Sequence, residues 1–299
     1  MGIWTWLTRG SGEGVAELAR RAGIPLSDLE NVPRAYQRFS IRKRNGGTRW
    51  IQAPNPQLRG FQRRLLRRVL GRLRCHPAAF GFERGRSIVD HAAGHSGRAV
   101  VVCLDLHDFF GATRQRRVEA YFRRIGWNRP ATRLLAALCC HQGCLPQGAP
   151  TSPRLSNLVN YGLDARLAGL ARAHGAHYSR YADDLTFSFA RDDPRAIRDV
   201  IGSTKSIVGD YGYRLHCRRK LRIRRRHQQQ RVTGLVVNAG PRVDRRTRRR
   251  LRAAVHRVRR GGEATYRPEQ LAGWLAYLAM IRRQVPAAPN SPPERKGPL

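Results

Sequence analysis

The chain has 299 residues, 41% of them hydrophobic, which is enough for at least one sizeable core and excludes a disordered protein. The chain has 58 lysines and arginines against 20 acids, and its net charge of +38 predicts a polyanionic partner. An enzyme that binds only small molecules would not account for this charge. No run approaches about 18 apolar residues, and the first ten residues lack a signal-peptide core. We therefore expect no membrane contact and a cytoplasmic protein, with its six scattered cysteines reduced.

The first half of the chain combines short helices with a hairpin and one buried strand. Residues 12–35 predict a short helical segment, and 36–54 a hairpin that turns at Asn45-Gly46-Gly47. Further helices are expected at 61–73, 115–125 and 130–141, and a buried strand at Val100–Leu106.

The second half begins with a loop rich in proline and glycine, Leu145–Pro153. The pattern then predicts a helix at 154–173, a hairpin at Tyr178–Phe189, a helix at 195–211, strands at 213–223 and 231–237, and helices at 244–260 and 268–283. This order indicates an α+β fold around an antiparallel sheet.

Positive charge is densest near the C-terminal end. Residues 211–299 hold 24 bases and 4 acids. In the predicted helix after residue 243, Leu251, Val255 and Val258 fit one apolar face, and arginines cover the rest. So few acids are nearby that we expect this surface to bind a nucleic-acid backbone.

Three acids stand among residues that belong in a core. Asp105 ends the strand VVVCLDL, and Asp183 and Asp184 lie near the turn of the second hairpin. Buried carboxylates are usually paired or bind a metal, so salt bridges to arginine are one interpretation. Two acids at a turn beside one acid on a neighbouring strand would also form a hard-oxygen pocket suited to Mg²⁺. Two such ions would stabilise the attacking and leaving oxygens of a phosphoryl transfer.

A zinc site is the alternative chemistry that the cysteines raise. Cys139, Cys140, His141 and Cys144 lie within six residues. Adjacent side chains from one loop cannot easily share a tetrahedral site, and no second ligand pair is near, so we favour a structural role for this segment.

Three boxes in order give the chain a family resemblance. Tyr181-Ala182-Asp183-Asp184 resembles the YxDD box of reverse transcriptases, and Asp105–Phe110 resembles their first palm box. Between them, Leu145–Pro153 is similar to the family's loop-helix box. The order and spacing of all three agree.

The resemblance is closer to the bacterial retron type and covers residues 36–283. His91–His95 is similar to the retron NAxxH element, with His91 in place of asparagine, and Val232–Asn238 resembles the VTG element. Ile41–Pro54 looks like the fingers hairpin and Phe80–Ile88 like the second fingers box.

The resemblance implies roles for named residues. Asp105, Asp183 and Asp184 would be catalytic and hold two Mg²⁺ ions with the Leu106 carbonyl, and Lys220 would protonate the leaving pyrophosphate or simply contact a phosphate. The expected nucleotide-binding residues are Phe110 as steric gate against the 2′-hydroxyl, Gln147, Gly148, Arg49 and Lys43. The expected RNA-contacting residues are His91, His95, Val232, Thr233 and Gly234.

The implied fold is a right-hand polymerase with a ferredoxin-like antiparallel palm. The expected divisions are an N-terminal segment and fingers at 1–97, a palm at 98–239 with a fingers contribution within 112–160, a basic helical thumb at 240–284 and a loose tail at 285–299.

The implied function is that of a retron reverse transcriptase. It would copy a cognate structured non-coding RNA into DNA from dNTPs, primed by a 2′-hydroxyl so that the product (msDNA) is a branched RNA–DNA. Such systems commonly act in anti-phage defence with an effector protein. Three alternatives stay open: another defence reverse transcriptase, an intron-derived one with further C-terminal segments, and a non-catalytic RNA-binding protein on a palm scaffold.

Overall fold

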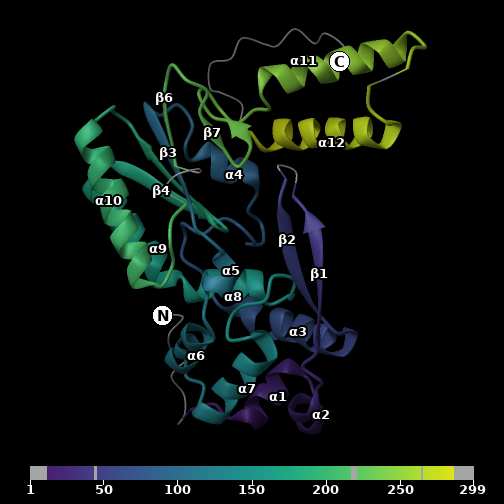
Figure 1. The fold of residues 1–299 in the computed structure, drawn as a ribbon, viewed down its shortest axis with the longest axis vertical. Coiled ribbons are helices and arrows are strands. Elements are labelled where there is room, and N and C mark those ends of the chain that lie inside the picture. The colour runs from purple at the N-terminus through teal and green to yellow at the C-terminus, as the bar shows by residue number, and fades with distance from the viewer. Residues whose placement is uncertain (1–11, 44–45, 217–220, 264, 286–299) are drawn as a thin grey trace.

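The structure is a computed structural model that describes residues 12–43, 46–216, 221–263 and 265–285 (Figure 1). Three regions follow one another in the view of Figure 1. Helices from the first half of the chain lie at the bottom, a four-stranded sheet with two covering helices lies at the left, and a C-terminal helix pair lies at the top. Within the described residues, no helix combines the length and apolarity that a membrane crossing requires.

The bottom region consists of several short helices, because residues that end or begin helices recur along its sequence. Gly23, at φ 64°, ends the first helix in the left-handed conformation, and Pro25 begins the next, so the predicted segment 12–35 is two helices. The Asn55 and Asn128 side chains cap two others by accepting hydrogen bonds from the backbone. The elements are α1 (Val15–Ala22), α2 (Leu26–Asn31), α3 (Pro56–Arg68), the 3₁₀ turn η2 (Leu70–Arg72), α6 (Gln115–Arg124) and α7 (Arg129–Cys139).

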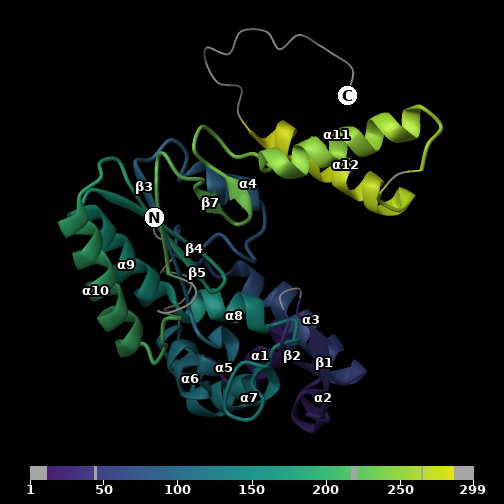
Figure 2. The same ribbon diagram turned by 45° about the horizontal axis from the view of Figure 1, so that its top comes forward.

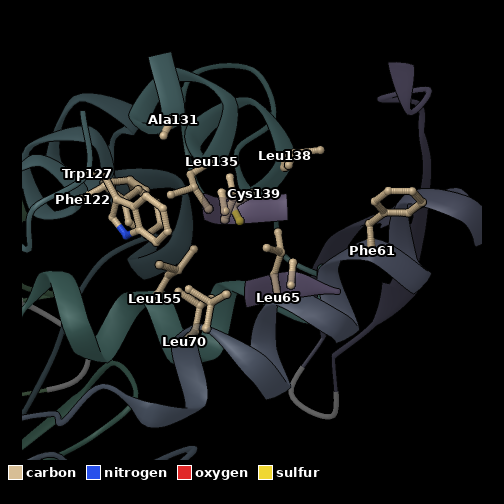
Figure 3. Packing of buried hydrophobic residues seen from close by; sticks show 14 of the residues in the cluster. Phe61, Leu65, Leu70, Phe122, Trp127, Ala131, Leu135, Leu138, Cys139 and Leu155 are labelled. Atoms are coloured by element: carbon tan, nitrogen blue, oxygen red, sulfur yellow. The ribbon is translucent and has the colours of Figure 1, made fainter. Parts of the chain in front are cut away.

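These helices bury a common hydrophobic core (Figure 3). Leu65 of α3, Phe122 of α6 and Leu135 of α7 are fully buried and point toward one another. Leu155 closes the core from the helix that leads to the sheet. Burial of each such side chain contributes roughly 1.5–3 kcal/mol, so this core is a firm base for the hairpin that rises from it.

The hairpin of β1 (Tyr36–Arg42) and β2 (Thr48–Pro54) projects from the helical base toward the C-terminal helices (Figure 1). Its outer part is exposed on both faces, and Phe39, Ile41 and Trp50 are large exposed apolar side chains. An exposed apolar ribbon of this kind marks an interaction surface.

The central sheet contains β3 (Val100–Asp105), β4 (Ala176–Tyr181), β5 (Asp184–Phe189) and β6 (Arg222–Arg225). The strands lie in the order β4-β5-β3-β6, and every neighbouring pair is antiparallel. This order agrees with the ferredoxin-like sheet that was predicted. One face packs on α9 (Tyr161–Ala173) and α10 (Pro194–Asp210) through side chains such as Val100, Val102 and Phe187.

Two predictions for the segments around the sheet were wrong. Instead of one helix at 154–173, α8 (Ser152–Val159) and α9 are separated at Asn160, whose side chain bonds the Ser156 carbonyl and the Tyr213 hydroxyl. Instead of a strand over 213–223, the described residues form a single bridge at Leu215 and then β6. The stretch before β6 runs past the end of β3, where His216 donates its backbone N–H to the Asp105 carbonyl.

The remaining elements are α4 (Ile88–Ala93), the short α5 (Phe109–Ala112), β7 (Arg231–Val232), β8 (Leu235–Val236), α11 (Arg245–Arg259) and α12 (Pro268–Gln284). α4, β7, β8 and α12 share a core with Val101 on the other face of the sheet, and α11 packs on α12. Phe109 of α5 instead joins the core that faces α9 and α10. The predicted strand 231–237 is thus a small hairpin. α11 and α12 lie side by side (Figure 2), and α12 also reaches the sheet, since Ile281 shares a core with Val89 and Val101. Of the predicted apolar face of α11, Leu251 is buried, whereas Val258 is 47% exposed.

Candidate active site

The β3–β5 ladder brings the three predicted acids to one end of the sheet. Asp105 is the last residue of β3, and Asp184, the first residue of β5, is its direct antiparallel partner. The backbone N–H of Leu106 donates to the Asp183 carbonyl at 2.9 Å, which ties the turn to the end of β3. Asp105 is buried, Asp183 is half-buried and Asp184 is exposed, so the three range from the sheet interior to solvent.

The turn that carries Asp183 and Asp184 is held in an unusual backbone conformation. Ala182 lies in the left-handed region at φ 56°. Gly81 packs directly against it, because a Cβ at Gly81 would come within 2.6 Å of the Ala182 backbone nitrogen. Only glycine permits this approach, so residues 80–83 pack against the turn and restrict its movement.

The chemistry of the donors suits a divalent metal ion, because the carboxylates of Asp105, Asp183 and Asp184 are the hard oxygen ligands that Mg²⁺ prefers. Their side chains are not gathered around a common point in this structure, since the described residues include no set of three or more His, Cys, Asp or Glu side chains placed to share a metal ion. His216 Nε2 lies 3.7 Å from Asp105 Oδ1, a neighbour that sequence reasoning missed. Leu106, the carbonyl of which was predicted to be a further metal ligand, has a buried side chain and donates its backbone N–H to the Asp183 carbonyl.

Phe109 and Phe110, which follow Asp105 closely in the sequence, face different environments. Asp108 takes the left-handed conformation at φ 46° and starts α5, so strand alternation does not apply. Phe109 is 5% exposed and stacks on Tyr213 at 5.8 Å between ring centroids. Phe110 is half-buried, with its centroid 6.1 Å from that of the exposed Phe82. The sequence did not indicate this contact between Phe82 and a predicted site residue.

Gln147 and Gly148 attach the projecting hairpin to the loop before α8. The backbone N–H of Gln52 in β2 donates to the Gln147 carbonyl at 2.9 Å. Gly148 lies at φ 140°, and a Cβ there would come within 2.7 Å of the Gln52 carbonyl. The close approach that Gly148 permits is therefore to β2.

The predicted triphosphate contacts lie on the same hairpin. Arg49 and Ile51 share one face of β2, and Ile51 is the side chain beside Gly148. Arg49 is therefore about 7 Å farther out along a face that meets the loop. Lys43 is exposed just after β1. Lys220 lies outside the described residues.

His91 and His95 are inside the molecule. His95 is fully buried and hydrogen-bonds Ser188 Oγ and Ser179 Oγ at 2.8 and 2.6 Å. Burial, and the neighbouring His177, lower the pKa of His91 to about 3. Burial likewise holds the pKa of His95 well below its usual range. Both rings are neutral at pH 7 and are buried away from the surface, so their contact with RNA stays a prediction.

The predicted VTG element is the turn between β7 and β8. Val232 is buried, whereas Thr233 is half-buried and Gly234 is exposed. Both turn residues have positive φ, 46° for Thr233 and 85° for Gly234. A β-branched residue rarely adopts this conformation, and Thr233 Oγ1 holds it by donating to the Ile88 carbonyl at 3.1 Å. The turn is thus a defined surface feature attached to α4.

The cysteine-rich segment has a structural environment. Cys139 is fully buried in the helical core, and burial raises its pKa to about 12. The His141 ring stacks on Tyr36 at 4.2 Å between centroids. Packing contacts of Cys139 and His141 therefore agree with the structural role that was favoured for this segment over a zinc site.

Comparison with known proteins agrees with this geometry. The family described as "Reverse transcriptase (RNA-dependent DNA polymerase)" matches residues 41–236. The chain therefore belongs to the reverse transcriptase family and has its palm-type polymerase fold, with relatives in the retron branch. Enzymes of this family use divalent metal ions.

Retron reverse transcriptases are similar over most of the chain. The Mx65 enzyme of Myxococcus xanthus is 40% identical, covering 83% of this chain and 62% of that protein. The Mx162 enzyme of the same species is 37% identical, covering 88% and 63%. The Ec86 enzyme of Escherichia coli is 32% identical, covering 82% and 76%. The chain thus spans less than two thirds of the length of the two Myxococcus relatives.

Proposed function

We propose that this protein is the RNA-directed DNA polymerase of a retron. It copies part of a cognate structured non-coding RNA from dNTPs, starting at a 2′-hydroxyl of that RNA, so that the product is a branched RNA–DNA. The observation that carries the proposal is the register of β3 and β5, which sets Asp105 opposite Asp184 beside the turn that holds Asp183. The similarity to retron reverse transcriptases supports the template class.

The proposed roles are those that the resemblance to reverse transcriptases implies. Asp105, Asp183 and Asp184 would bind two Mg²⁺ ions, which when bound stabilise negative charge on the attacking and leaving oxygens. The Leu106 carbonyl would be a further ligand, and Lys220 would supply a proton to the pyrophosphate. Phe110 would exclude the 2′-hydroxyl of the incoming nucleotide.

The hairpin, loop and buried histidines take supporting roles in this proposal. Gln147 and Gly148 would set the position of the hairpin from which Arg49 and Lys43 meet the triphosphate. The turn at Thr233 and Gly234 would contact the RNA at the surface. His91, His95 and Val232 would support that contact by fixing α4 and the two strands beside the turn.

Basic side chains extend from the acids along the same sheet face. Cys103 shares a face with Asp105, and a hollow beside Cys103 is lined by Arg222, Arg224 and Arg231. These arginines would hold the backbone of the RNA–DNA product. Residues 1–97, 98–239 and 240–284 would act as fingers, palm and thumb, with part of 112–160 joining the fingers and 285–299 forming a tail. A cytoplasmic role in anti-phage defence with an effector protein completes the proposal.

Primer extension tests the polymerase activity. Purified protein is given an RNA template, an annealed DNA primer, dNTPs and Mg²⁺, and we expect extension that depends on all four. Absence of extension with an intact, RNA-binding preparation would favour a non-catalytic RNA-binding protein.

Sequencing of co-purified nucleic acid tests the retron assignment. We expect DNA joined to one structured RNA through a 2′–5′ branch, which a debranching nuclease releases as a linear strand. Extension without any branched product would favour another defence or intron-derived reverse transcriptase.

A further inference from the structure

Arg180 is a charged side chain in the centre of the palm. It precedes Tyr181 at the end of β4 and is 0% exposed, the largest of the fully buried side chains among the residues that the structure describes. A buried guanidinium is costly unless nearly all of its donors find partners. The hydrogen-bond partners of Arg180 therefore indicate its role in the structure.

Two of its nitrogens bind a carboxylate in α9. Nε donates to Asp164 Oδ1 at 2.8 Å, and Nη2 donates to Asp164 Oδ2 at 2.6 Å. The Tyr178 hydroxyl donates to the same Oδ1 at 2.9 Å. Burial alone would lower the pKa of Arg180, but Asp164 raises it, so the guanidinium stays charged. This two-point pair fixes the plane of the guanidinium.

The third nitrogen reaches the turn that carries the acids. Nη1 donates to the Ala182 carbonyl at 3.1 Å and to Asn157 Oδ1 at 3.0 Å. Ala182 is the left-handed residue directly before Asp183. Gly81 packs on the backbone nitrogen of Ala182, so the turn is held from both sides.

The same contacts reach the segment opposite the turn. Asn157 Nδ2 donates to the Gly81 carbonyl and to Glu83 Oε1, both at 2.7 Å. Glu83 in turn forms an ion pair with Arg154 of α8. Arg180 thus lies at the junction of β4, α8, α9 and the segment around Phe82.

We propose that Arg180 is a positioning residue for catalysis, because its guanidinium fixes the Ala182 carbonyl and hence the direction in which Asp183 and Asp184 leave the turn. This inference rests on the proposed polymerase function. Arginine is required because one planar group must bind Asp164 at two points while a third nitrogen faces the turn, and a lysine ammonium cannot keep that geometry.

Metal affinity and turnover in matched variants test the proposal. Arg180→Lys keeps the buried charge, and the double variant Arg180→Met/Asp164→Leu removes both charges, a replacement that proteins often tolerate. Tyr178→Phe is the control, because it removes a bond to Asp164 but none to the turn. Mn²⁺ binding by calorimetry in the absence of dNTP, kcat and KM for dNTP, and the melting temperature are measured on each full-length protein.

We expect both Arg180 variants to lose about 10–100-fold in Mn²⁺ affinity and kcat, as is typical when a residue behind a metal ligand is changed. The KM for dNTP should stay within about threefold, and Tyr178→Phe should match the wild type in Mn²⁺ affinity and kcat. Wild-type Mn²⁺ affinity and kcat in either folded Arg180 variant, or equal losses in Tyr178→Phe, would overturn the proposal. A wild-type protein that binds Mn²⁺ but extends no primer would instead contradict the proposed function.

Discussion

The Phe110 ring lies beside the Phe82 ring, 6.1 Å between centroids, on the exposed side of α5, while its neighbour Phe109 is buried against Tyr213. The adjacent residues Phe109 and Phe110 therefore have different structural roles. Phe109 packs the sheet core, and Phe110 with Phe82 presents an aromatic surface next to the end of β3 that carries Asp105.

This division predicts how sugar selection responds to mutation. Phe110→Ala should raise the ratio of rNTP to dNTP incorporation, because space for a 2′-hydroxyl opens, with a modest loss of dNTP use. Phe109→Ala should leave that ratio unchanged and lower the free energy of unfolding by about 3–5 kcal/mol. The ratio is measured on one RNA template for both variants. Relaxed selection in Phe109→Ala alone would show that the two rings have been assigned the wrong way round.

The buried histidines predict a stability that falls in mild acid. The pKa of His91 is about 3 in the folded protein and near 6.5 when unfolded. The unfolded chain therefore binds more protons, and stability is lost as the pH falls below about 6.5. His91 should contribute a loss of about 2 kcal/mol between pH 6.5 and pH 5.

His91→Asn isolates this contribution because asparagine does not titrate. Chemical unfolding at both pH values should show a smaller pH dependence in the variant, whatever its absolute stability. Burial is the largest cause that lowers the pKa of His95, and this cause remains in the variant, although the smaller effect of His91 on His95 is removed. Identical pH dependence in the two proteins would mean that His91 is not held neutral.

The arginines of α11 predict the salt dependence of RNA binding. Arg249, Arg252 and Arg257 line one hollow on the helix surface. Changing all three to Gln should reduce the magnitude of the slope of log K against log salt by about 2–3, since each phosphate contact contributes roughly 0.7–0.9. The same change at the exposed Arg195 and Arg198 of α10, on the far side of the sheet, is the control. Equal slopes for the α11 variant and the wild type would remove α11 from the RNA path.

Short-range patterns made the scaffold of the site predictable. Apolar runs ending in Asp105 and beginning after Asp184 specify two buried strands, and the strand order then places these acids together. Helix boundaries depended on longer-range contacts, as at Asn160, whose side chain bonds the hydroxyl of Tyr213, 53 residues further along the chain. The position of Arg180 behind the turn could not be predicted either, because its ion pair is formed with Asp164 on a separate helix.

The central claim is that Asp105, Asp183 and Asp184 form a polymerase centre on an RNA-binding scaffold, and the Asp183→Asn variant tests it most directly. Asparagine keeps the shape of the side chain but removes the charge that would bind a metal, and leaves the basic surface unchanged. RNA-templated primer extension and RNA affinity are measured on the same preparation, with melting temperature as the check on folding. We predict that extension is abolished while RNA affinity stays within about twofold of the wild type. Extension at near wild-type rates by this variant would contradict the account.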